Sequence, residues 1–439
     1  MSHPPPPSRP APERAPGTGA LSHELRVWWD ALAAVAAGIV AMIVVAVLGL
    51  WAAGADALPS GAFPAVVAAT VVTAVGGTVE VSGGAGFVGR TSGGLVVVPL
   101  SVTLAGAVAV AVLFLLPLRH RAVAGGTELL GRVARTAVLW LLAVLIVALA
   151  ARHTFRISLG EDFIDELGEA LGATPTVGFR AAVGPTLGYA LLWLLVLLAI
   201  ATAVSRKTPL PSRLLRFQDS VRPAAFAMLV VLFAYVAIGL IVGVAVALSR
   251  GHADRTVAVL LLGLPNLAWM GLGIGLGGAW EGQVPAADIG LPVPKPLAAV
   301  LRENDGGPAT LDLASLSAHD GRAWLLVLLA VLALLAAGFV TAVRSPADRR
   351  HWQHALQLAV AAALTLLVIG LLTHVEARFG LSLLGIGDLG DDFGGEVTLQ
   401  AQLPRLVGLG ALGGFLAGFL GSLAASRVRR RGEVDAPPA

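Results

Sequence analysis

Two glutamates carry the clearest chemical signal in the sequence, because each closes the same pattern of residues. The first copy runs from Pro64 through eleven mostly small apolar residues, a Gly-Gly pair and two further residues to Glu80. The second begins at Pro265 and reaches Glu281 at the same spacing. Ionisable groups beside membrane-buried segments are costly and are often functional. Glu80 and Glu281 are therefore the candidate gate or cation site.

A structural role is the alternative for both carboxylates, and it has the greater weight. Each glutamate could cap a turn or pair with a loop arginine such as Arg90. Proline lacks an N–H group and glycine readily adopts φ > 0, so both residue types interrupt helices. We therefore expect two short helices that re-enter the membrane or lie at its surface. The predicted breaks are Pro64, Gly76 and Gly77 in the first copy and Pro265, Gly277 and Gly278 in the second.

Membrane helices are the elements that we expect to position these residues. Hydrophobic residues make up 56% of the chain, charged residues only 13%, and the mean hydropathy is +0.83. A soluble domain is nearer to about one quarter charged. Apolar runs of about twenty residues match the helix length that crosses a hydrocarbon core of roughly 30 Å. The runs are 31–53, 95–117, 136–151, 186–204, 223–248, 323–343, 355–373 and 406–425.

The predicted fold is therefore all-α: a polytopic membrane helix bundle of about eight spanning helices with two re-entrant or interfacial helices. Arginines gather between alternate runs, in segments 119–135, 206–222, 344–350 and 427–431. The positive-inside rule places these segments and both termini in the cytoplasm. This assignment requires that the two Pro…Gly-Gly…Glu segments stay on the outer side without crossing. The scarcity of lysine beside arginine fits a high-GC genome and a bacterial plasma membrane.

An internal duplication is predicted from the recurrence of the pattern. Gly38 and Gly239 share its spacing, and His153 and His374 each follow a predicted span. Each half has an even number of spans, which predicts two parallel tandem repeats. The predicted divisions are a disordered Pro-rich cytoplasmic tail (1–30), membrane repeat 1 (31–207), a cytoplasmic linker (208–222), membrane repeat 2 (223–427) and a cytoplasmic tail (428–439).

Small residues recur every fourth position along the last predicted span. Such a face lets another helix approach closely, within the monomer or, with less weight, in a dimer. The predicted packing face is Gly410, Gly414, Gly418 and Ser422.

Two glycine motifs imitate nucleotide sites without the strand–helix context that such sites need. They are Gly84, Gly89, Arg90 and Thr91, and Gly273, Gly275 and Gly278.

Histidines and acidic loops give weaker signals. His153 and His374 could form a symmetric metal or pH-sensing pair, although no ligand spacing supports it. His351 and His354 lie in a basic link where contact with lipid headgroups is more plausible. The acidic clusters could collect cations but are more simply solvated surface. They are Glu161, Asp162, Asp165, Glu166 and Glu169, and Asp388, Asp391, Asp392 and Glu396.

One short stretch resembles a known family. The residues Val98-Pro99-Leu100-Ser101-Val102-Thr103-Leu104-Ala105-Gly106 resemble the streptophobe family of hydrophobic multi-span proteins. The preceding glycine-rich stretch 81–94 and the Pro-rich N-terminus are similar as well. The resemblance implies an integral membrane protein of streptomycetes or related actinobacteria. It brings no established activity and no site residues.

No catalytic constellation, cofactor motif or metal site is predicted, and the chain has no cysteine. We expect a non-enzymatic plasma-membrane protein that is transporter- or channel-like, with an outer vestibule between two repeats. A membrane scaffold or envelope sensor that binds a partner through its outer loops is the alternative. An enzyme acting on lipid-linked substrates is a weaker one. The expected partners are the bilayer and an unknown solute or protein; nucleic acid is not expected, and the oligomeric state is left open.

Overall fold

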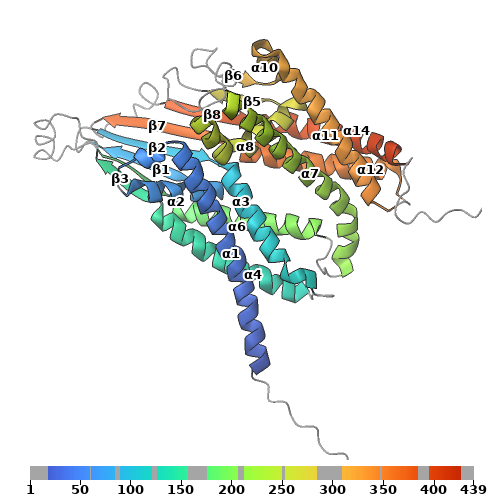
Figure 1. Cartoon of the computed structure of the whole chain (residues 1–439), viewed down its shortest axis with the longest axis horizontal. Coiled ribbons are helices and arrows are strands. Elements are labelled where there is room, and N and C mark those ends of the chain that lie inside the picture. The colour runs from blue at the N-terminus through green and yellow to red at the C-terminus, as the bar shows by residue number, and fades with distance from the viewer. Residues whose placement is uncertain are drawn as a thin grey trace, which may run out of the picture.

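A bundle of long apolar helices forms most of the chain, as a computed structural model describes it (Figure 1). The described residues are 18–59, 61–84, 89–120, 126–156, 176–205, 212–249, 253–283, 309–346, 349–383 and 395–426. Within them, eight helices are long and apolar enough to cross a membrane. They are α1 (Thr18–Ala52), α4 (Gly126–Ala150), α6 (Val183–Val204), α7 (Ser212–Ser249), α8 (Ala253–Gly275), α11 (Trp324–Arg344), α12 (His351–Leu372) and α14 (Leu403–Ala425). The predicted polytopic helix bundle is confirmed.

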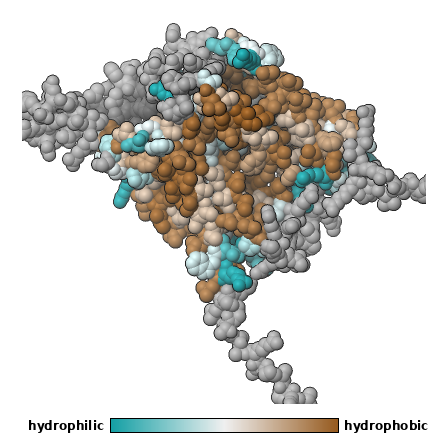
Figure 2. Space-filling view, viewed as in Figure 1, coloured by the Kyte–Doolittle hydropathy of each residue, from teal (hydrophilic) through white to brown (hydrophobic). Residues whose placement is uncertain are grey.

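The shorter helices complete the bundle. They are α2 (Ala62–Ala74), α3 (Leu100–Leu115), α10 (Leu313–His319) and the 3₁₀ turns η1 (Ala55–Ala57), η2 (Pro117–His120) and η3 (Gly321–Ala323). Hydrophobic residues form a broad brown surface over the helices in Figure 2, with hydrophilic residues gathered near its borders. This distribution is that of a protein whose lateral surface faces lipid.

Several predicted boundaries are wrong. Helix α8 is one continuous helix of 23 residues that runs through Pro265, so this proline does not break it. Apolar helices tolerate internal proline when neighbouring helices support them. Helix α3 has only 16 residues, because part of the predicted run 95–117 belongs to a strand. The eight helices selected by length thus include α8 instead of α3.

The predicted tail and linker are partly helical. Helix α1 begins at Thr18, inside the segment predicted to be disordered. Ion pairs with α4 hold this extension: Arg135 Nη2 lies 2.8 Å from Glu24 Oε2, and Arg132 Nη2 lies 3.9 Å from Asp30 Oδ2. Helix α7 likewise starts within the predicted linker 208–222. Residues 1–17 and the predicted C-terminal tail 428–439 lie outside the described residues.

An eight-stranded antiparallel sheet is the feature that the sequence analysis missed. Its order is β3-β4-β1-β2-β7-β8-β5-β6. The strands are β1 (Val79–Gly84), β2 (Gly89–Val97), β3 (Arg152–Arg156), β4 (Thr176–Ala181), β5 (Trp280–Gln283), β6 (Ala309–Leu311), β7 (Val375–Leu383) and β8 (Gly395–Ala401). The sequence instead predicts connecting segments over most of these residues, the ends of the Pro…Gly-Gly…Glu segments at β1 and β5, and the start of a span at 95–97. The signal was present as alternation: Val79 is buried and Glu80 exposed, and Trp280 and Glu281 repeat this order.

The strands continue directly from helix ends and point away from the bundle. In Figure 1 the long strands β2 and β7 run from the helices toward the left edge of the molecule. The order α-α-β-β-α-α-β-β-α of α1–α6 recurs in α7–α14, apart from the inserted α10 and the 3₁₀ turns. The half-sheets β3-β4-β1-β2 and β7-β8-β5-β6 also have the same strand order. This agreement is what a duplication would produce; shared origin of the halves stays a prediction.

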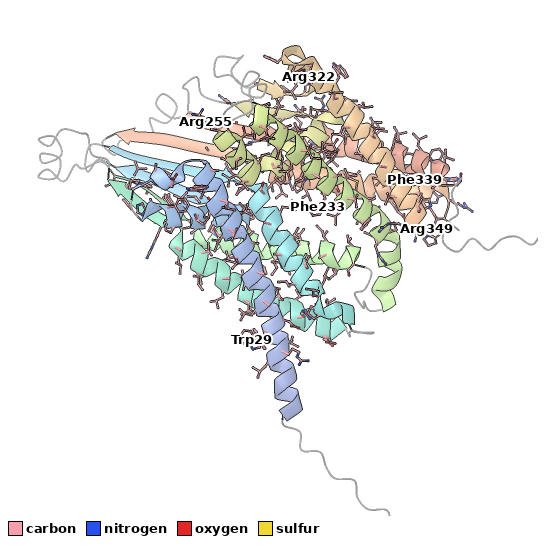
Figure 3. The ribbon with its side chains drawn as sticks, viewed as in Figure 1. Trp29, Phe233, Arg255, Arg322, Phe339 and Arg349 are labelled. Carbon is pink, nitrogen blue, oxygen red and sulfur yellow. The ribbon has the colours of Figure 1, made fainter. Side chains whose placement is uncertain are left out.

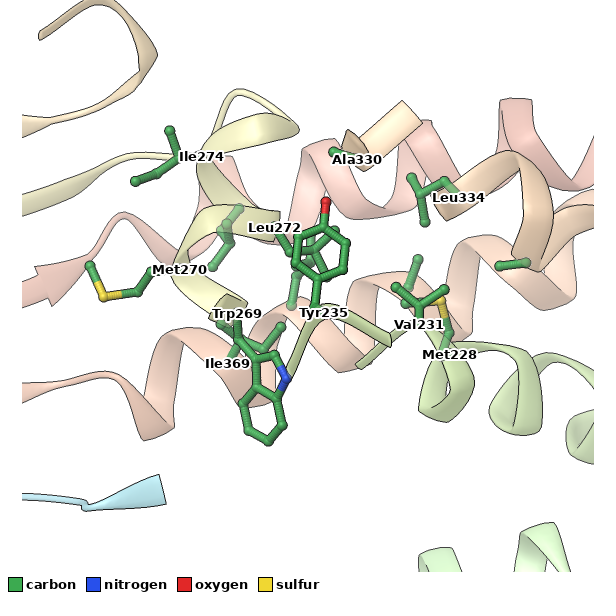
Figure 4. Packing of buried hydrophobic residues seen from close by; sticks show 14 of the residues in the cluster. Met228, Val231, Tyr235, Trp269, Met270, Leu272, Ile274, Ala330, Leu334 and Ile369 are labelled. Atoms are coloured by element: carbon green, nitrogen blue, oxygen red, sulfur yellow. The ribbon is translucent and has the colours of Figure 1, made fainter. Parts of the chain in front are cut away.

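Two large hydrophobic clusters follow the two halves, although the larger one also includes Val98 and Leu100 of the first half. One cluster gathers residues of α1, α2, α3, α4 and α6, and the larger one gathers residues of α7, α8, α11, α12 and α14. Figure 4 shows the second, in which Tyr235, Trp269, Leu272 and Leu334 pack together between three helices. Trp269 Nε1 donates to Leu232 O at 3.1 Å, which joins α8 to α7. Dense packing of this kind fixes the positions of the helix ends.

Asn266 joins the two halves. Its Nδ2 donates to Val98 O at 2.9 Å, and its Oδ1 accepts from Leu100 N at 3.0 Å. Val98 O lies just after β2, and Leu100 N is the first N–H group of α3. Neither group has a partner within its own strand or helix, and the Asn266 side chain supplies one to both. Ser101 Oγ adds a bond to Leu260 O at 3.0 Å. These contacts tie α3 of the first half to α8 of the second.

Replacing Asn266 tests this joint. Asn266→Leu is expected to lower the free energy of unfolding by about 1–2 kcal/mol, because two backbone groups lose their partner in an apolar setting. Ser101→Ala should cost less, since Leu260 O lies inside α8 and has an intrahelical donor. Thermal unfolding in detergent, followed by circular dichroism, measures both. Equal stability of Asn266→Leu and wild type would contradict the assignment.

Candidate functional site

The first Pro…Gly-Gly…Glu segment is a helix stop followed by a strand. Pro64 lies in the first turn of α2, where its missing N–H is harmless. Gly76 has φ of +84°, a left-handed conformation that favours glycine. Gly77 N then donates to Val72 O at 2.9 Å, which is the long bond of a Schellman motif. A Cβ on Gly77 would lie 2.8 Å from that same oxygen. Both glycines are therefore required by the stop itself.

The second segment stops in the same way. Gly277 has φ of +90°, and Gly278 N donates to Gly273 O at 2.8 Å. A Cβ on Gly278 would lie 2.8 Å from that carbonyl oxygen. The helix breaks predicted at both Gly-Gly pairs are thus present, whereas the break at Pro265 is not. Three residues after each Gly-Gly pair the chain reaches the glutamate, on the first strand of each half-sheet in chain order.

Glu80 has an arginine partner. It lies on β1 directly opposite Arg180 of β4, and Arg180 Nε is 2.9 Å from Glu80 Oε2. Both side chains are exposed, 50% for Glu80 and 75% for Arg180. Arg90, the loop arginine named from the sequence, lies instead on β2 opposite Gly84. Water screens a pair of this kind, so it contributes little to stability.

Glu281 lies in a different setting. It is exposed on β5 opposite Gln400, and Gln402 Nε2 donates to its Oε1 at 2.6 Å. A shallow, open depression of about 480 Å³ adjoins it. The lining residues are Glu281, Ala401, Gln402, Leu403, Pro404 and Arg405.

The two glutamates do not meet. Strands β2, β7 and β8 lie between β1 and β5 in the sheet. Neighbouring strands are about 4.8 Å apart, so four steps place Glu80 and Glu281 about 19 Å apart across the sheet. They face solvent, each with a partner of its own. A gate formed by the two carboxylates together has no basis in this geometry.

A row of charged residues crosses the base of the first half-sheet. Arg152 of β3 lies opposite Arg180, which lies opposite Glu80, so the three share one face. Neither arginine is among the site residues predicted from the sequence, where Arg152 is expected only to extend the span 136–151 by reaching toward the membrane surface. Neither stretch, Arg152-His153-Thr154-Phe155 or Val177-Gly178-Phe179-Arg180, alternates strictly between polar and apolar residues, so neither carries a clear strand signal.

The histidines are separated in the same way. His153 Cε1 lies near Gly61, and its ring packs on Phe155 with centroids 4.8 Å apart. His374 Nε2 lies 3.3 Å from Glu376 Oε2 in the second half. Among the described residues, no three His, Asp or Glu side chains gather where they could hold a metal ion. At the opposite end of the bundle, His351 Nδ1 is 3.0 Å from Ser422 Oγ, and His354 is buried.

The small-residue face of α14 lies against α12 of the same chain. A Cβ on Gly414 would be 2.7 Å from Leu358 O, and one on Gly418 would be 2.8 Å from both Ala355 Cα and His354 O. Gly410 and Ser422 complete the face, against Leu366 and His351 respectively. The close approach between backbones is therefore within the monomer.

The remaining motifs have no nucleotide geometry. Gly84 and Gly89–Thr91 lie on the paired strands β1 and β2, and Gly273 and Gly275 lie at the C-terminal end of α8. The acidic residues of 161–169 and 388–392 lie outside the described residues. Glu396 lies on β8 opposite Arg378 in the backbone register.

A matched pair of glycines tests the α12–α14 contact. Gly418→Ala should destabilise the protein by about 1–3 kcal/mol, because the new methyl group meets backbone atoms that cannot move aside independently. Gly408→Ala on the same helix meets nothing within 4 Å, and alanine is the better helix former. It should leave the melting temperature unchanged or raise it. Equal effects of the two substitutions would contradict the packing described.

The separation of the glutamates predicts independent effects. Glu80→Gln and Glu281→Gln should each change the free energy of unfolding by less than about 1 kcal/mol, since both groups are exposed. In the double variant the two changes should add to within about 0.5 kcal/mol. Denaturation of the four proteins in the cycle measures the coupling, and a coupling above about 1 kcal/mol would show that the carboxylates share a site.

No protein-family description, curated protein or solved structure matches the chain significantly. The resemblance to the streptophobe family accordingly stays a prediction. The chain is an integral membrane protein with a sheet at one end of its helix bundle.

Proposed function

We propose that the chain is a non-catalytic envelope protein of the bacterial plasma membrane that binds a protein partner through the polar face of its sheet. The observation that carries this proposal is the two-faced sheet. Residues on one face, such as Glu80, Ser82 and Arg180, are exposed, whereas Val79 and Ala181 on the other are buried. Antiparallel sheets with one solvated face are suited to presenting polar groups to a partner.

The distribution of arginine supports an outward-facing sheet. Arg132 and Arg135 of α4, Arg344 of α11, and Arg349 and Arg350 before α12 all lie toward helix ends that do not lead into strands. In Figure 3, Arg349 lies at the end of α11 and α12 farthest from the strands, whereas Arg322 lies at the opposite end of α11. A concentration of basic residues marks the cytoplasmic side. Both chain ends then belong to the cytoplasm.

Chain connectivity supports non-crossing roles for α2 and α8. Helix α6 starts at the sheet, so after crossing it ends on the far side, where α7 begins. If α7 crosses back, α8 both begins and ends on the sheet side, since its C-terminus leads into β5. The same argument applies to α1 and α2. Helix α2 has 13 residues, about 20 Å, which is too short to cross. In this arrangement α3 crosses in place of α8.

The transporter- or channel-like prediction lacks a site of the expected kind. It required Glu80 and Glu281 to line one vestibule between the halves, and they lie on strands separated by three others. The described contact between α1 and α8 is close-packed: a Cβ added to Gly49 would lie only 2.6 Å from Leu262 Cδ2. Binding a partner on the polar face of the sheet does not require the two halves to separate.

Cysteine labelling tests the orientation, because the chain has no native cysteine. Thr154→Cys on β3 should react with a membrane-impermeant maleimide in intact cells, since this position is exposed on the sheet. Arg350→Cys, at the opposite end of the bundle, should react only after permeabilisation. The reverse pattern would place the sheet in the cytoplasm and overturn the proposed orientation.

Site-specific photo-crosslinking tests the binding role. A photoreactive residue at Ser82, on the polar face, should give a discrete protein adduct in living cells. The matched control is Leu142, 54% exposed on the apolar face of α4, which should give no such protein adduct. Absence of any adduct from Ser82, Thr154 and Gln283, together with solute flux in proteoliposomes that Glu80→Gln or Glu281→Gln abolishes, would favour transport instead.

A further inference from the structure

Two arginines lie opposite each other at the base of the first half-sheet. Arg152 and Arg180 are direct cross-strand partners, and both side chains are exposed. Directly opposed residues have Cβ atoms about 4.5–5.5 Å apart, and like charges at that distance destabilise a sheet. Glu80 bonds to Arg180 Nε and balances one of the two charges. The group of three keeps one positive charge that a bound anion would neutralise.

The second half shows that the sheet does not need these arginines. Gln400 takes the place opposite Glu281 that Arg180 takes opposite Glu80. His374 takes the place of Arg152. Each lies two residues after a helix end, Arg152 after α4 and His374 after α12. The same strand order is thus built with a histidine and a glutamine at the positions of the two arginines. The arginine pair is a property of the first half alone.

Both arginines lie where a lipid-facing surface ends. Arg152 comes two residues after the end of α4, whose Ile146 and Leu149 are 62% and 52% exposed. Arg180 comes three residues before α6 begins, and Tyr189 in the second turn of α6 is 52% exposed. Tyrosine is typical of the membrane–water interface. In the membrane placement proposed above, this is the level of the headgroup phosphates, and the lipid inference rests on that placement.

We propose that Arg152 and Arg180 bind the phosphodiester of an anionic phospholipid in the leaflet on the sheet side. Guanidinium groups suit this ligand because their planar N–H donors match phosphate oxygens in pairs. The acyl chains lie along the exposed apolar residues of α4 and α6. The carboxylate of Glu80 repels a phosphate and attracts an ammonium, so taken alone it would favour a zwitterionic headgroup. The two arginines outweigh it, and the net positive charge of the group favours an anionic headgroup without an ammonium. Arg180 and Glu80 also belong to the polar face proposed above to bind a protein partner, so the lipid site overlaps the edge of that face. Retained lipid, measured on the purified protein without a partner, tests the lipid site separately.

The test exchanges residues within the chain. The double variant Arg152→His/Arg180→Gln carries the residues of the second half at these positions. The full-length protein, purified in detergent, is incubated with equal phosphatidylglycerol and phosphatidylcholine, and retained lipids are counted by native mass spectrometry. Wild type should retain phosphatidylglycerol preferentially, and the variant should lose roughly three- to tenfold of that preference. Glu80→Gln, which removes the competing carboxylate, should increase it.

Controls separate a site from general charge. Arg255→Gln/Arg322→Gln removes two exposed arginines of the second half and should keep the preference; an equal loss in this variant would overturn the proposal. Equal retention by wild type and Arg152→His/Arg180→Gln would overturn it as well. Millimolar inorganic phosphate should not displace the lipid, and full displacement would reassign the site to a soluble phosphate. If the double variant misfolds, Arg152→Gln alone should lower the phosphatidylglycerol preference and Glu80→Gln should raise it. An unchanged preference in both variants would overturn the proposal.

Discussion

Backbone hydrogen bonding in an apolar surrounding is the constraint on which the rest of the structure depends. Lipid offers no partners to a peptide group, so a helix can end there only where its last carbonyls are satisfied. At the ends of α2 and α8 the Schellman bonds to Val72 O and Gly273 O serve this purpose. The chain then enters strands whose next groups are paired across the sheet: Ala182 N donates to Thr78 O, and Gln402 N donates to Ala279 O. Helix ends and sheet therefore form one hydrogen-bonded layer.

This layer explains why the Pro…Gly-Gly…Glu pattern recurs. Its glycines are required by backbone conformation, its apolar residues by the core, and its glutamate by the polar face of the first strand. The pattern is thus structural, and its final glutamate has different neighbours in the two halves. In the first half the glutamate has an arginine partner, and in the second an amide and a shallow depression. One backbone frame carries two different surfaces.

The sequence predicts seven of the eight span-length helices, because continuous apolar runs of about twenty residues are a strong signal. Helix α8 is the exception, since its Pro and Gly residues favoured a broken segment. The Gly-Gly stops were also predicted, since φ > 0 is a local requirement of glycine. The sheet was not predicted, because its strands of three to nine residues are short and lie in connecting segments or at the ends of segments predicted to be helical. Pairings such as Arg152 with Arg180 join residues far apart in the chain, and no local pattern specifies them. The predicted helix break at Pro265 was wrong for a related reason. Whether a helix can continue through a proline depends on the neighbouring helices, which the local sequence does not show.

Glu80 and Glu281 lie on separate strands of one sheet and face solvent independently. Pulsed electron spin resonance measures this directly, because a chain without native cysteine can carry spin labels at Glu80→Cys and Glu281→Cys alone. The sheet order predicts a narrow distance distribution centred at about 20 Å or more, allowing for the label linkers. A distribution below about 10 Å would bring the two positions into one site and contradict the account.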